Sequence, residues 1–562
     1  MDNLRIFLWV GLLMLVWLNV QTWQQTFSPP TATTTATPAN GASPAGQASQ
    51  SPDASAADSG ALPALQAGTT EAAPTVVPPA ADTDATTAAS ALIHVRTDVF
   101  DLQIDTRGGN IVDVRLPTYP VHKDKPDVPV ELLNQTPVHF FVYQDGLRAA
   151  NGQPEANHLA TFTAATDSFE MAPGADELQV PLRWQDADGI TVTKTYTFHR
   201  GSFAIDQVYT VTNHGDKPYE AAQYLQIQRV STPQKRSMFD VDTYSFHGPV
   251  AYNGEKYQKI KVEDLHDTPF SENVSNGWFA AIQHHFLAAA VPPPDQVWHY
   301  NARLSDGKFQ ISAIGPLTTV APGQTENFSA KLFVGPKLQK QLSVTAPRLE
   351  LTVDYGRLTL LAQPMFWLLS KVHGVVHNWG LAIILVTFLI KLVFYKLAET
   401  SGRSMAGMRK LQPRMKALQE RFKDDRQAMS KALMELYKKE KINPAAGCLP
   451  MLVQIPFFIS FYWVLLESVE MRQAPFILWI TDLSSKDPYF ILPLLMGAAM
   501  FFQQKLNPPP PDPVQAKMMQ IMPIAFTVFF AFFPAGLVLY WLTNSVLSIA
   551  QQWRINKMLG AN

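Results

Sequence analysis

Residues 381–397 read LAIILVTFLIKLVFYKL, a run apolar enough for the interior of a lipid bilayer except at Lys391. A charge near the middle of a spanning helix costs a few kcal/mol even on the more lenient insertion scales, so such a residue usually faces a protein interior or a hydrated cavity. Lysine can also extend its side chain toward the membrane surface, and Lys396 lies close by on the same segment. The spacing alone leaves both interpretations of Lys391 open.

The composition is that of a membrane protein with large soluble parts. The 562 residues include 45 Lys and Arg against 47 Asp and Glu, a formal charge of −2 that indicates no nucleic-acid partner. Several apolar runs are longer than the segments that a soluble core would use. The single cysteine, Cys448, excludes an intramolecular disulfide and is expected to be a core residue.

The first 90 residues are predicted to form an anchor and a tether. Residues 1–27 place Arg5 before an apolar stretch with no small-residue cleavage site directly after it, which predicts an uncleaved signal-anchor span. Residues 28–90 consist mainly of Ala, Thr, Pro, Ser and Gly, without an aromatic residue. Such a segment cannot bury enough apolar surface to offset its ordering entropy, so we expect a disordered tether.

Residues 91–350 are predicted to form an all-β, sandwich-like domain. Short segments such as 99–105, 190–198 and 205–213 alternate apolar and polar side chains and are rich in β-branched and aromatic residues. Gly, Asp, Asn and Pro separate these segments. The pattern is typical of antiparallel strands with one buried face.

From residue 351 onward the sequence becomes helical in pattern and increasingly apolar. Residues 351–378 mix apolar side chains with Arg357, Lys371, His373 and His377, which suits an amphipathic helix lying in the membrane interface. Five apolar runs follow, and with the N-terminal anchor they predict six spans, some of them short and interrupted by proline. The five runs are 379–397, 449–466, 489–502, 518–533 and 535–550.

The positions of Lys and Arg predict the topology. Residues 396–441 contain thirteen Lys or Arg and six Asp or Glu, so this loop is expected in the cytoplasm. Residues 467–488 are slightly acidic and are expected outside. Both termini then lie in the cytoplasm and the β domain lies outside.

The basic loop, residues 398–448, has apolar residues at threes and fours on both sides of a polar KDDR turn. This pattern predicts a helical hairpin with an apolar seam. The seam serves either to bind another molecule or only to pack the two helices on each other.

No phosphate-binding loop, HExxH motif or cysteine-rich metal pattern occurs in the sequence, which argues against an ATP-driven transporter and a zinc protease. If the segment around His284 and His285 is a strand, the two side chains point to opposite faces and do not share a metal. We therefore expect no cofactor and no metal.

Polar side chains recur inside the predicted spans. Thr387, Lys391 and Tyr395 are spaced four apart, which predicts one polar helical face. Gln454 lies in the third span, and Tyr540 and Asn544 begin a second stripe with the same spacing, which Ser548 continues. The economical arrangement points all these groups at one shared hydrated cavity.

At these residues the sequence resembles the YidC membrane protein insertases of the Gram-negative type, which have a large periplasmic domain. The resemblance is specific at NWGLAIILVTFLIKLVFY (378–395), NPAAGCLPMLVQIPFF (443–458) and FFPAGLVLYWLTNSVLSIAQQ (532–552), and it extends over nearly the full chain. It implies a polytopic α-helical protein with a five-helix insertase core and a periplasmic β super-sandwich at 91–350. It also divides the membrane part into the second span at 379–397, the hairpin at 398–448, and spans three to six with a short cytoplasmic tail at 449–562.

The resemblance implies a non-enzymatic insertase and chaperone of the bacterial inner membrane. Its partners would be nascent membrane proteins, the lipid bilayer and the Sec translocon. Direct docking of ribosomes or of the signal recognition pathway is left open, because the tail after Trp553 lacks an extended basic arm. A groove open to cytoplasm and lipid carries an arginine in the family's second span, and Lys391 stands at that position here. Lysine keeps the positive charge but lacks the planar fork of donors.

The resemblance also assigns client-contacting aromatic residues. Phe458, Phe529 and Phe530 would contact the incoming helix, and Tyr540 and Trp541 would line the upper part of the groove. Ordinary lipid-facing or interhelical packing is the alternative for all five.

Two other classes of function remain to be compared with the insertase. A channel or transporter would use Lys391 to bind an anion, but the sequence shows no self-similarity between its halves. An envelope carbohydrate-binding protein anchored by its spans would leave the polar face inside the membrane without a purpose.

Overall fold

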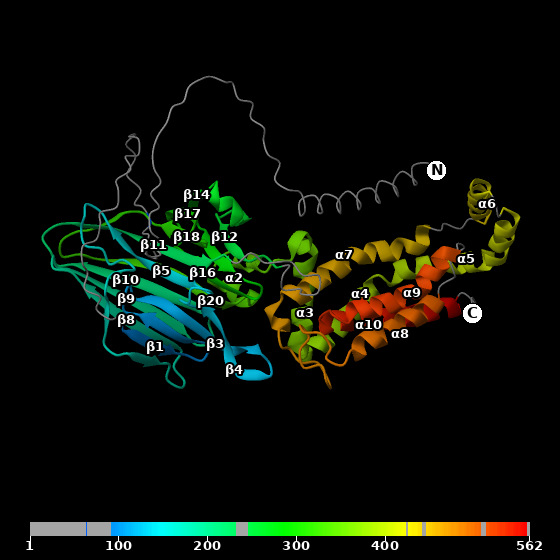
Figure 1. Ribbon diagram of the computed structural model, residues 1–562, viewed down its shortest axis with the longest axis horizontal. Coiled ribbons are helices and arrows are strands. Elements are labelled where there is room, and N and C mark those ends of the chain that lie inside the picture. The colour runs from blue at the N-terminus through cyan, green and yellow to red at the C-terminus, as the bar shows by residue number, and fades with distance from the viewer. Residues whose placement is uncertain are drawn as a thin grey trace, which may run out of the picture. The chain divides into compact units, whose positions relative to one another are not determined.

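The structure is a computed structural model that describes residue 63 and residues 91–231, 245–422, 425–440, 445–506 and 513–558 (Figure 1). The signal anchor predicted for 1–27 lies outside the described residues, as does nearly all of the tether predicted for 28–90. The described residues all belong to one compact unit, 58–562.

The first part of the described chain is built from three β-sheets (Figure 1). One is five-stranded, in the order β4 (Lys125–Leu133), β3 (Asn110–His122), β2 (Asp101–Asp105), β1 (Leu92–Arg96) and β7 (Ser168–Glu170). The strands of the predicted segments pair antiparallel, and at one edge of this sheet β1 and β7 pair in parallel. Residues 97–167 separate these two strands, whereas a tight hairpin would impose antiparallel pairing.

The two larger sheets complete the β domain. The nine-stranded sheet has the order β13 (Tyr257–Lys259), β12 (Gly248–Tyr252), β15 (Trp278–Ile282), β16 (Phe286–Val291), β20 (Thr325–Pro336), β10 (Ala204–Asn213), β9 (Ile190–His199), β8 (Glu177–Gln185) and β6 (Thr163–Ala164). The six-stranded sheet has the order β14 (Phe270–Ser275), β17 (Val297–Ser305), β18 (Lys308–Ile314), β11 (Tyr219–Val230) and β19 (Thr318–Val320), with β5 (Phe141–Ala149) also paired to β11.

The predicted strand segments coincide with real strands because their alternating pattern matches alternating burial. Segment 205–213 falls in β10, where buried and half-buried residues alternate along the strand. Segment 190–198 falls in β9, which pairs with β10 in register. Segment 99–105 contains β2.

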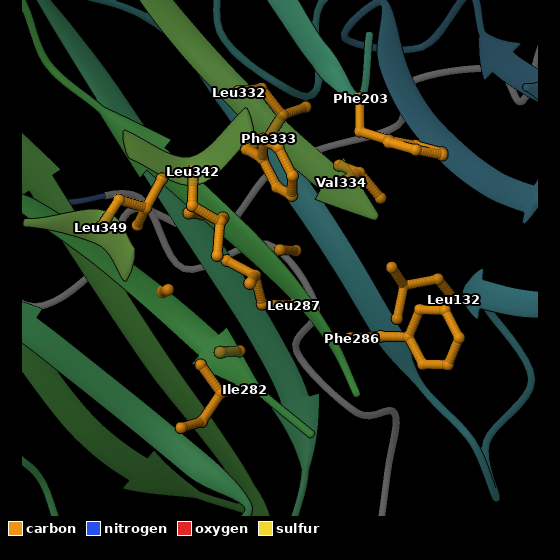
Figure 2. Close-up of a cluster of buried hydrophobic side chains, with 14 of the residues drawn as sticks. Leu132, Phe203, Ile282, Phe286, Leu287, Leu332, Phe333, Val334, Leu342 and Leu349 are labelled. Atoms are coloured by element: carbon orange, nitrogen blue, oxygen red, sulfur yellow. The ribbon is translucent and has the colours of Figure 1, made fainter. Parts of the chain in front are cut away.

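Large apolar side chains from several elements fill the core of the β domain. Figure 2 shows Leu132 from β4, Phe286 and Leu287 from β16, and Leu332 from β20 in one cluster. Leu342 from helix α2 (Gln339–Thr345) joins them, so this short helix packs onto the sheets. Each fully buried side chain of this kind contributes about 1.5–3 kcal/mol to stability.

One fully buried ion pair interrupts this apolar core. Nζ of Lys194 donates a hydrogen bond of 3.0 Å to Asp145, and neither side chain is accessible. Gln207 and Tyr209 also donate to the Asp145 carboxylate, and Lys194 donates to the Gly108 carbonyl. Because both charges are paired and hydrogen-bonded, the domain tolerates them in its interior.

The remaining elements are helices joined by short connections. The 3₁₀ turns are η2 (Glu263–His266), η3 (Leu349–Thr352), η4 (Gly356–Leu358) and η5 (Val469–Met471). The α-helices are α3 (Thr359–Val376), α4 (Trp379–Val393), α5 (Tyr395–Arg421), α6 (Arg426–Lys439), α7 (Ala445–Glu467), α8 (Ile491–Lys505), α9 (Pro513–Phe530) and α10 (Ala535–Met558). Helix α3 exposes Leu360, Trp367 and Val375, as an amphipathic helix does.

The helix predicted across 379–397 is broken. Helix α4 ends at Val393 and α5 starts at Tyr395, with a bend of 61° between α4 and the first part of α5. No glycine or proline lies within 381–397, so the sequence carries no signal for this break. Within the described ranges, no helix taken alone has both the length and the apolar character to cross a bilayer. The bent pair Trp379–Val393 and Tyr395–Ser404 has both when taken together.

Helices α5 and α6 lie next to each other in the predicted hairpin. Leu411 and Met415 of α5 are buried, and the hydroxyl of Tyr437 in α6 lies 3.7 Å from Sδ of Met415. Arg414 and Glu440 form an ion pair at 2.5 Å across the two segments. Part of the apolar seam is therefore used between the two helices.

Candidate functional site

Lys391 lies near the C-terminal end of α4, and its ammonium contacts two side chains from other helices. Nζ donates a hydrogen bond of 2.8 Å to Oγ of Ser548 in α10. A longer bond of 3.5 Å reaches Oε1 of Gln454 in α7. Polar partners of this kind lower the cost of placing a charge among apolar helices. The geometry favours an interior position for the charge over a side chain extended along α4 toward the membrane surface.

The contacts of Lys391 close into a ring. Nε2 of Gln454 donates to Oδ1 of Asn544 at 2.5 Å, and Oγ of Ser548 donates to the Asn544 carbonyl at 2.7 Å. The Ser548 hydroxyl thus donates its one O–H to the backbone and accepts from Lys391 with one of its two lone pairs. Three helices, α4, α7 and α10, are tied together at one point by this ring.

Two predicted members of the polar face do not join the ring. The Thr387 hydroxyl is buried and donates to the Ile383 carbonyl of its own helix at 2.7 Å. Tyr395 lies beyond the bend, where the guanidinium of Arg554 sits 5.9 Å from its ring centroid. Thr387 and Lys391 lie four residues apart in α4, whereas the break at Phe394 places Tyr395 in the next helix.

Aromatic side chains from α7, α9 and α10 meet in a second cluster. The ring of Phe458 lies 4.6 Å from Trp541 and 5.9 Å from Tyr540, centroid to centroid. Phe530 is buried and lies 5.4 Å from Trp541. Phe529 differs from these residues, because 52% of it is exposed.

This arrangement gives the two clusters different chemical capacities. The ring around Lys391 presents a fixed positive charge whose ammonium uses two of its three N–H groups on the described partners. In the aromatic cluster Tyr540 and Phe530 are almost fully covered by their neighbours, and Phe529 is the exposed member.

His284 and His285 are not arranged as the sequence predicted. They lie in the turn between β15 and β16 rather than within a strand, and their rings stack at 3.8 Å. Nε2 of each ring lies within 3.2 Å of the Leu466 carbonyl. In the described part of the chain, no group of three or more His, Cys, Asp or Glu side chains is placed to hold a metal ion.

Ser548 is the main addition to the predicted site. The sequence placed it in a four-spaced stripe with Tyr540 and Asn544, but nothing in that stripe indicated which member would bind the Lys391 ammonium. The side chain of Cys448 lies outside the described residues.

Comparisons with known proteins cover the whole described chain. Residues 92–368 match the family model of the YidC periplasmic domain, and residues 371–562 match that of the 60Kd inner membrane protein. The chain is 49% identical over 569 residues to membrane protein insertase YidC of Thioalkalivibrio sulfidiphilus, with 99% of this chain and 98% of the relative covered. It is 44% identical to the protein of that name from Pseudomonas syringae pv. tomato, covering 100% of this chain and 99% of the relative.

A solved structure described as an active YidC insertase with its first transmembrane domain resolved also matches. It is 18% identical, with a TM-score of 0.37, and the match covers 82% of this chain and 94% of the solved chain.

Proposed function

Because this chain belongs to the YidC family of membrane protein insertases, which are not enzymes, we propose that it captures nascent hydrophobic segments and releases them into the bilayer beside Lys391. The chain is an inner-membrane protein with a β-sheet periplasmic domain and a helical core. Its substrates are nascent membrane proteins. The location of the charge, the contact residues and the cooperation with the Sec translocon are the parts that we propose.

The observation that carries the mechanism is the ring that holds Lys391 between α4, α7 and α10. A positive charge in a partly buried, hydrated groove attracts acidic groups in the short translocated tail of a client. At 4 Å two opposite charges attract by about 4 kcal/mol at the effective dielectric of a protein surface. That attraction offsets part of the cost of moving a polar tail across the apolar region.

Lysine in place of the family's arginine changes what the charge can recognise. The ammonium is a point charge with three rotatable donors, whereas a guanidinium presents a planar fork that matches a carboxylate. Two donors already bond within the ring, so the remaining one makes a single bond to a client carboxylate. We expect recognition by charge, with little dependence on the client's geometry.

The aromatic cluster is the proposed contact for the apolar part of the client. Phe529, the exposed member, meets lipid or client first, Phe530 packs against it, and Phe458 packs against Trp541. Tyr540 and Trp541 form the floor against which these rings pack. The hairpin at 398–448 would deliver the client from the cytoplasm, either with the Sec translocon or without it.

Two measurements test this function. Photo-crosslinking from probes at Phe458 and Lys391 to a stalled single-span nascent protein should yield crosslinks from both positions. The variant Lys391→Ala should lose insertion of clients with acidic tails and keep insertion of clients with neutral tails, whereas Lys391→Arg should insert both.

Ion flux through the purified protein serves as the control that separates a channel from an insertase. Flux that falls in Lys391→Ala while insertion of every client is unchanged would overturn the groove-charge mechanism.

A further inference from the structure

The β domain contacts the connection between α7 and α8 through a surface that none of the insertase chemistry uses. On the β-domain side lie the β15–β16 turn, the residues after β20 and the β3–β4 hairpin. On the helical side lie the last turn of α7 and residues 467–482. The surface holds more buried charge than the aromatic or Lys391 clusters, and its chemistry goes beyond the proposed function.

Glu467 forms the first half of this surface. It is 1% exposed at the end of α7, and Ser245 of the β domain donates to its Oε1 at 2.7 Å. Nε2 of His284 lies 3.8 Å from the same oxygen. Lys337, also 1% exposed, lies near enough for its charge to interact with that of Glu467. The carboxyl therefore has a hydroxyl and two basic groups around it.

Glu470 forms the second half of this surface, and one of its carboxyl oxygens lacks a hydrogen-bond partner in the described part of the chain. Its Oε2 is buried and has no hydrogen-bond partner among the described residues. Tyr119 of β3, Tyr355 near the start of α3 and the Gln339 backbone of α2 lie around it. Arg472, from the same segment as Glu470, interacts with the same Tyr119. A carboxylate left with a buried, unbonded oxygen costs more than a neutral carboxyl in the same place.

Backbone contacts complete the surface next to Glu470. The Arg472 guanidinium donates to the carbonyls of Pro120 and Val121 at 2.8 and 3.1 Å. Lys123, at the tip of the β3–β4 hairpin, donates to the carbonyls of Gln473 and Thr481. Glu470 lies two residues before Arg472 and interacts electrostatically with Tyr119 of β3, so its carboxyl and the hairpin contact belong to the same short stretch.

We propose that this surface is a proton-dependent dock, in which protonation of the Glu470 carboxyl tightens the hold of the β domain on the connection between α7 and α8. The titratable groups around the dock are Glu467, Lys337, His284, Asp354 and Lys259, together with Tyr119, Tyr355 and Arg472.

The direction of the pH dependence follows from burial. Burial raises the pKa of Glu470 from its ordinary value to about 7 in the docked protein. A group with a raised pKa binds its proton more tightly in the docked state, so its contribution is present at low pH and is lost as the pH rises through about 7. Burial lowers the pKa of Lys337 to about 8, so its protonation opposes docking mainly above that pH and reduces the effect by only about twofold between pH 8 and pH 5.5.

Hydrogen–deuterium exchange of the full-length protein in lipid nanodiscs tests the dock. Protection factors, corrected for the pH dependence of intrinsic exchange, would be followed in residues 117–125 and 468–474. Lowering the pH from about 8 to about 5.5 should raise protection about 25-fold in both segments, as linkage to one raised carboxyl requires. Amides of β9 and β10 serve as an internal check that the β domain stays folded.

The decisive variant is Glu470→Gln, which is neutral at every pH and close in shape to the protonated acid. It should give high protection and a clearly smaller pH dependence, the remainder coming from Glu467, whose pKa burial also raises. Glu263→Gln, an exposed carboxyl of the β domain, should behave as the unchanged protein does. A flat profile in the unchanged protein overturns the proposal. The same follows if Glu470→Gln keeps the original profile or loses protection while β9 and β10 stay protected.

Discussion

The position of the positive charge in the core is set by Ser548, a residue of another helix. Ser548 accepts the shorter of the two hydrogen bonds from the Lys391 ammonium and donates its own hydrogen bond to the Asn544 carbonyl. A lysine has a flexible four-carbon stem and no planar group to fix its direction. The charge therefore depends on its partners more than an arginine would.

Replacing Ser548 by alanine should weaken insertion selectively. A hydrogen bond to a charged group contributes about 1.5–3 kcal/mol, so a charge that loses it should be less well placed and insertion of clients with acidic tails should fall by about tenfold or more. Insertion of clients with neutral tails should not change. Both rates can be measured in proteoliposomes with the same client carrying either tail.

Ser548→Thr is the matched control for that variant, because threonine keeps the hydroxyl that bonds Lys391. It should insert both clients normally. An equal loss for acidic and neutral tails in Ser548→Ala would show that Ser548 only supports the packing of α10.

Sequence reasoning at the residue scale found the charge but not its surroundings. Lys391 was identifiable because a single charge in an apolar run is costly. Gln454, Asn544 and Ser548 were identifiable as polar residues in spans, but their connection depends on the packing of three helices. Glu467 and Glu470 contributed to the acidic balance of residues 467–488, but nothing in the sequence indicated their contacts, since their partners come from positions far away in the chain.

The helices of the core pack closely where glycine permits it. Gly497 of α8 faces Thr527 of α9, and a Cβ at that position would overlap the Thr527 hydroxyl. Thr527 in turn donates to the Pro523 carbonyl of its own helix at 2.8 Å, so its side chain has a preferred orientation. The contact between α8 and α9 requires a residue without a side chain.

The pair Gly497→Ala and Gly374→Ala should separate packing from helix propensity. Overpacking at Gly497 should lower stability by about 1–3 kcal/mol. Gly374 of α3 has no neighbour within 4 Å of an added Cβ, so alanine there should raise stability slightly through its better helix propensity. Urea unfolding of the purified protein in detergent, followed by tryptophan fluorescence, measures both.

An unchanged urea midpoint of unfolding in Gly497→Ala would mean that the Thr527 side chain rotates away without a cost in stability. A loss in both variants of the same size would point to a general effect on the helices.

At the scale of elements, strands were easier to predict than helix ends. The alternating apolar residues of β9 and β10 form the buried face of each strand. That period of two is visible in the sequence and does not depend on how the strands are arranged in the fold. The break at Phe394 has no glycine or proline to mark it. The turn at His284 and His285 was missed because the apolar residues on both sides continue the pattern of a single strand.

Across the whole molecule, the β domain and the helical core meet through contacts made largely to backbone carbonyls. Arg472 donates to Pro120 and Val121, and Gln473 donates to Pro120. Backbone carbonyls accept hydrogen bonds whatever the side chain is, so this part of the contact tolerates substitution on the hairpin but not on the connection.

Arg472→Ala should therefore loosen the hairpin without unfolding either part. Loss of two hydrogen bonds from a charged group should speed amide exchange in residues 117–125 about tenfold or more at neutral pH. Lys261→Ala, an exposed cation of the β domain, is the control and should leave exchange unchanged. Exchange in 117–125 that is identical in Arg472→Ala and the control would show that these bonds do not hold the hairpin.

The bend at Phe394 is the pivot between α4, which carries Lys391, and the long helix α5. Helix α5 has 27 residues, which corresponds to about 40 Å at the usual rise of an α-helix. A swing of about 10° at Phe394 would displace the far end of α5 by about 7 Å, given that length. Lys391 lies on the other side of the pivot, tied to Ser548 and Gln454. A change of angle at Phe394 therefore displaces the far end of α5 much more than it displaces Lys391, although Gly402 near the start of α5 packs against Ile555 of α10.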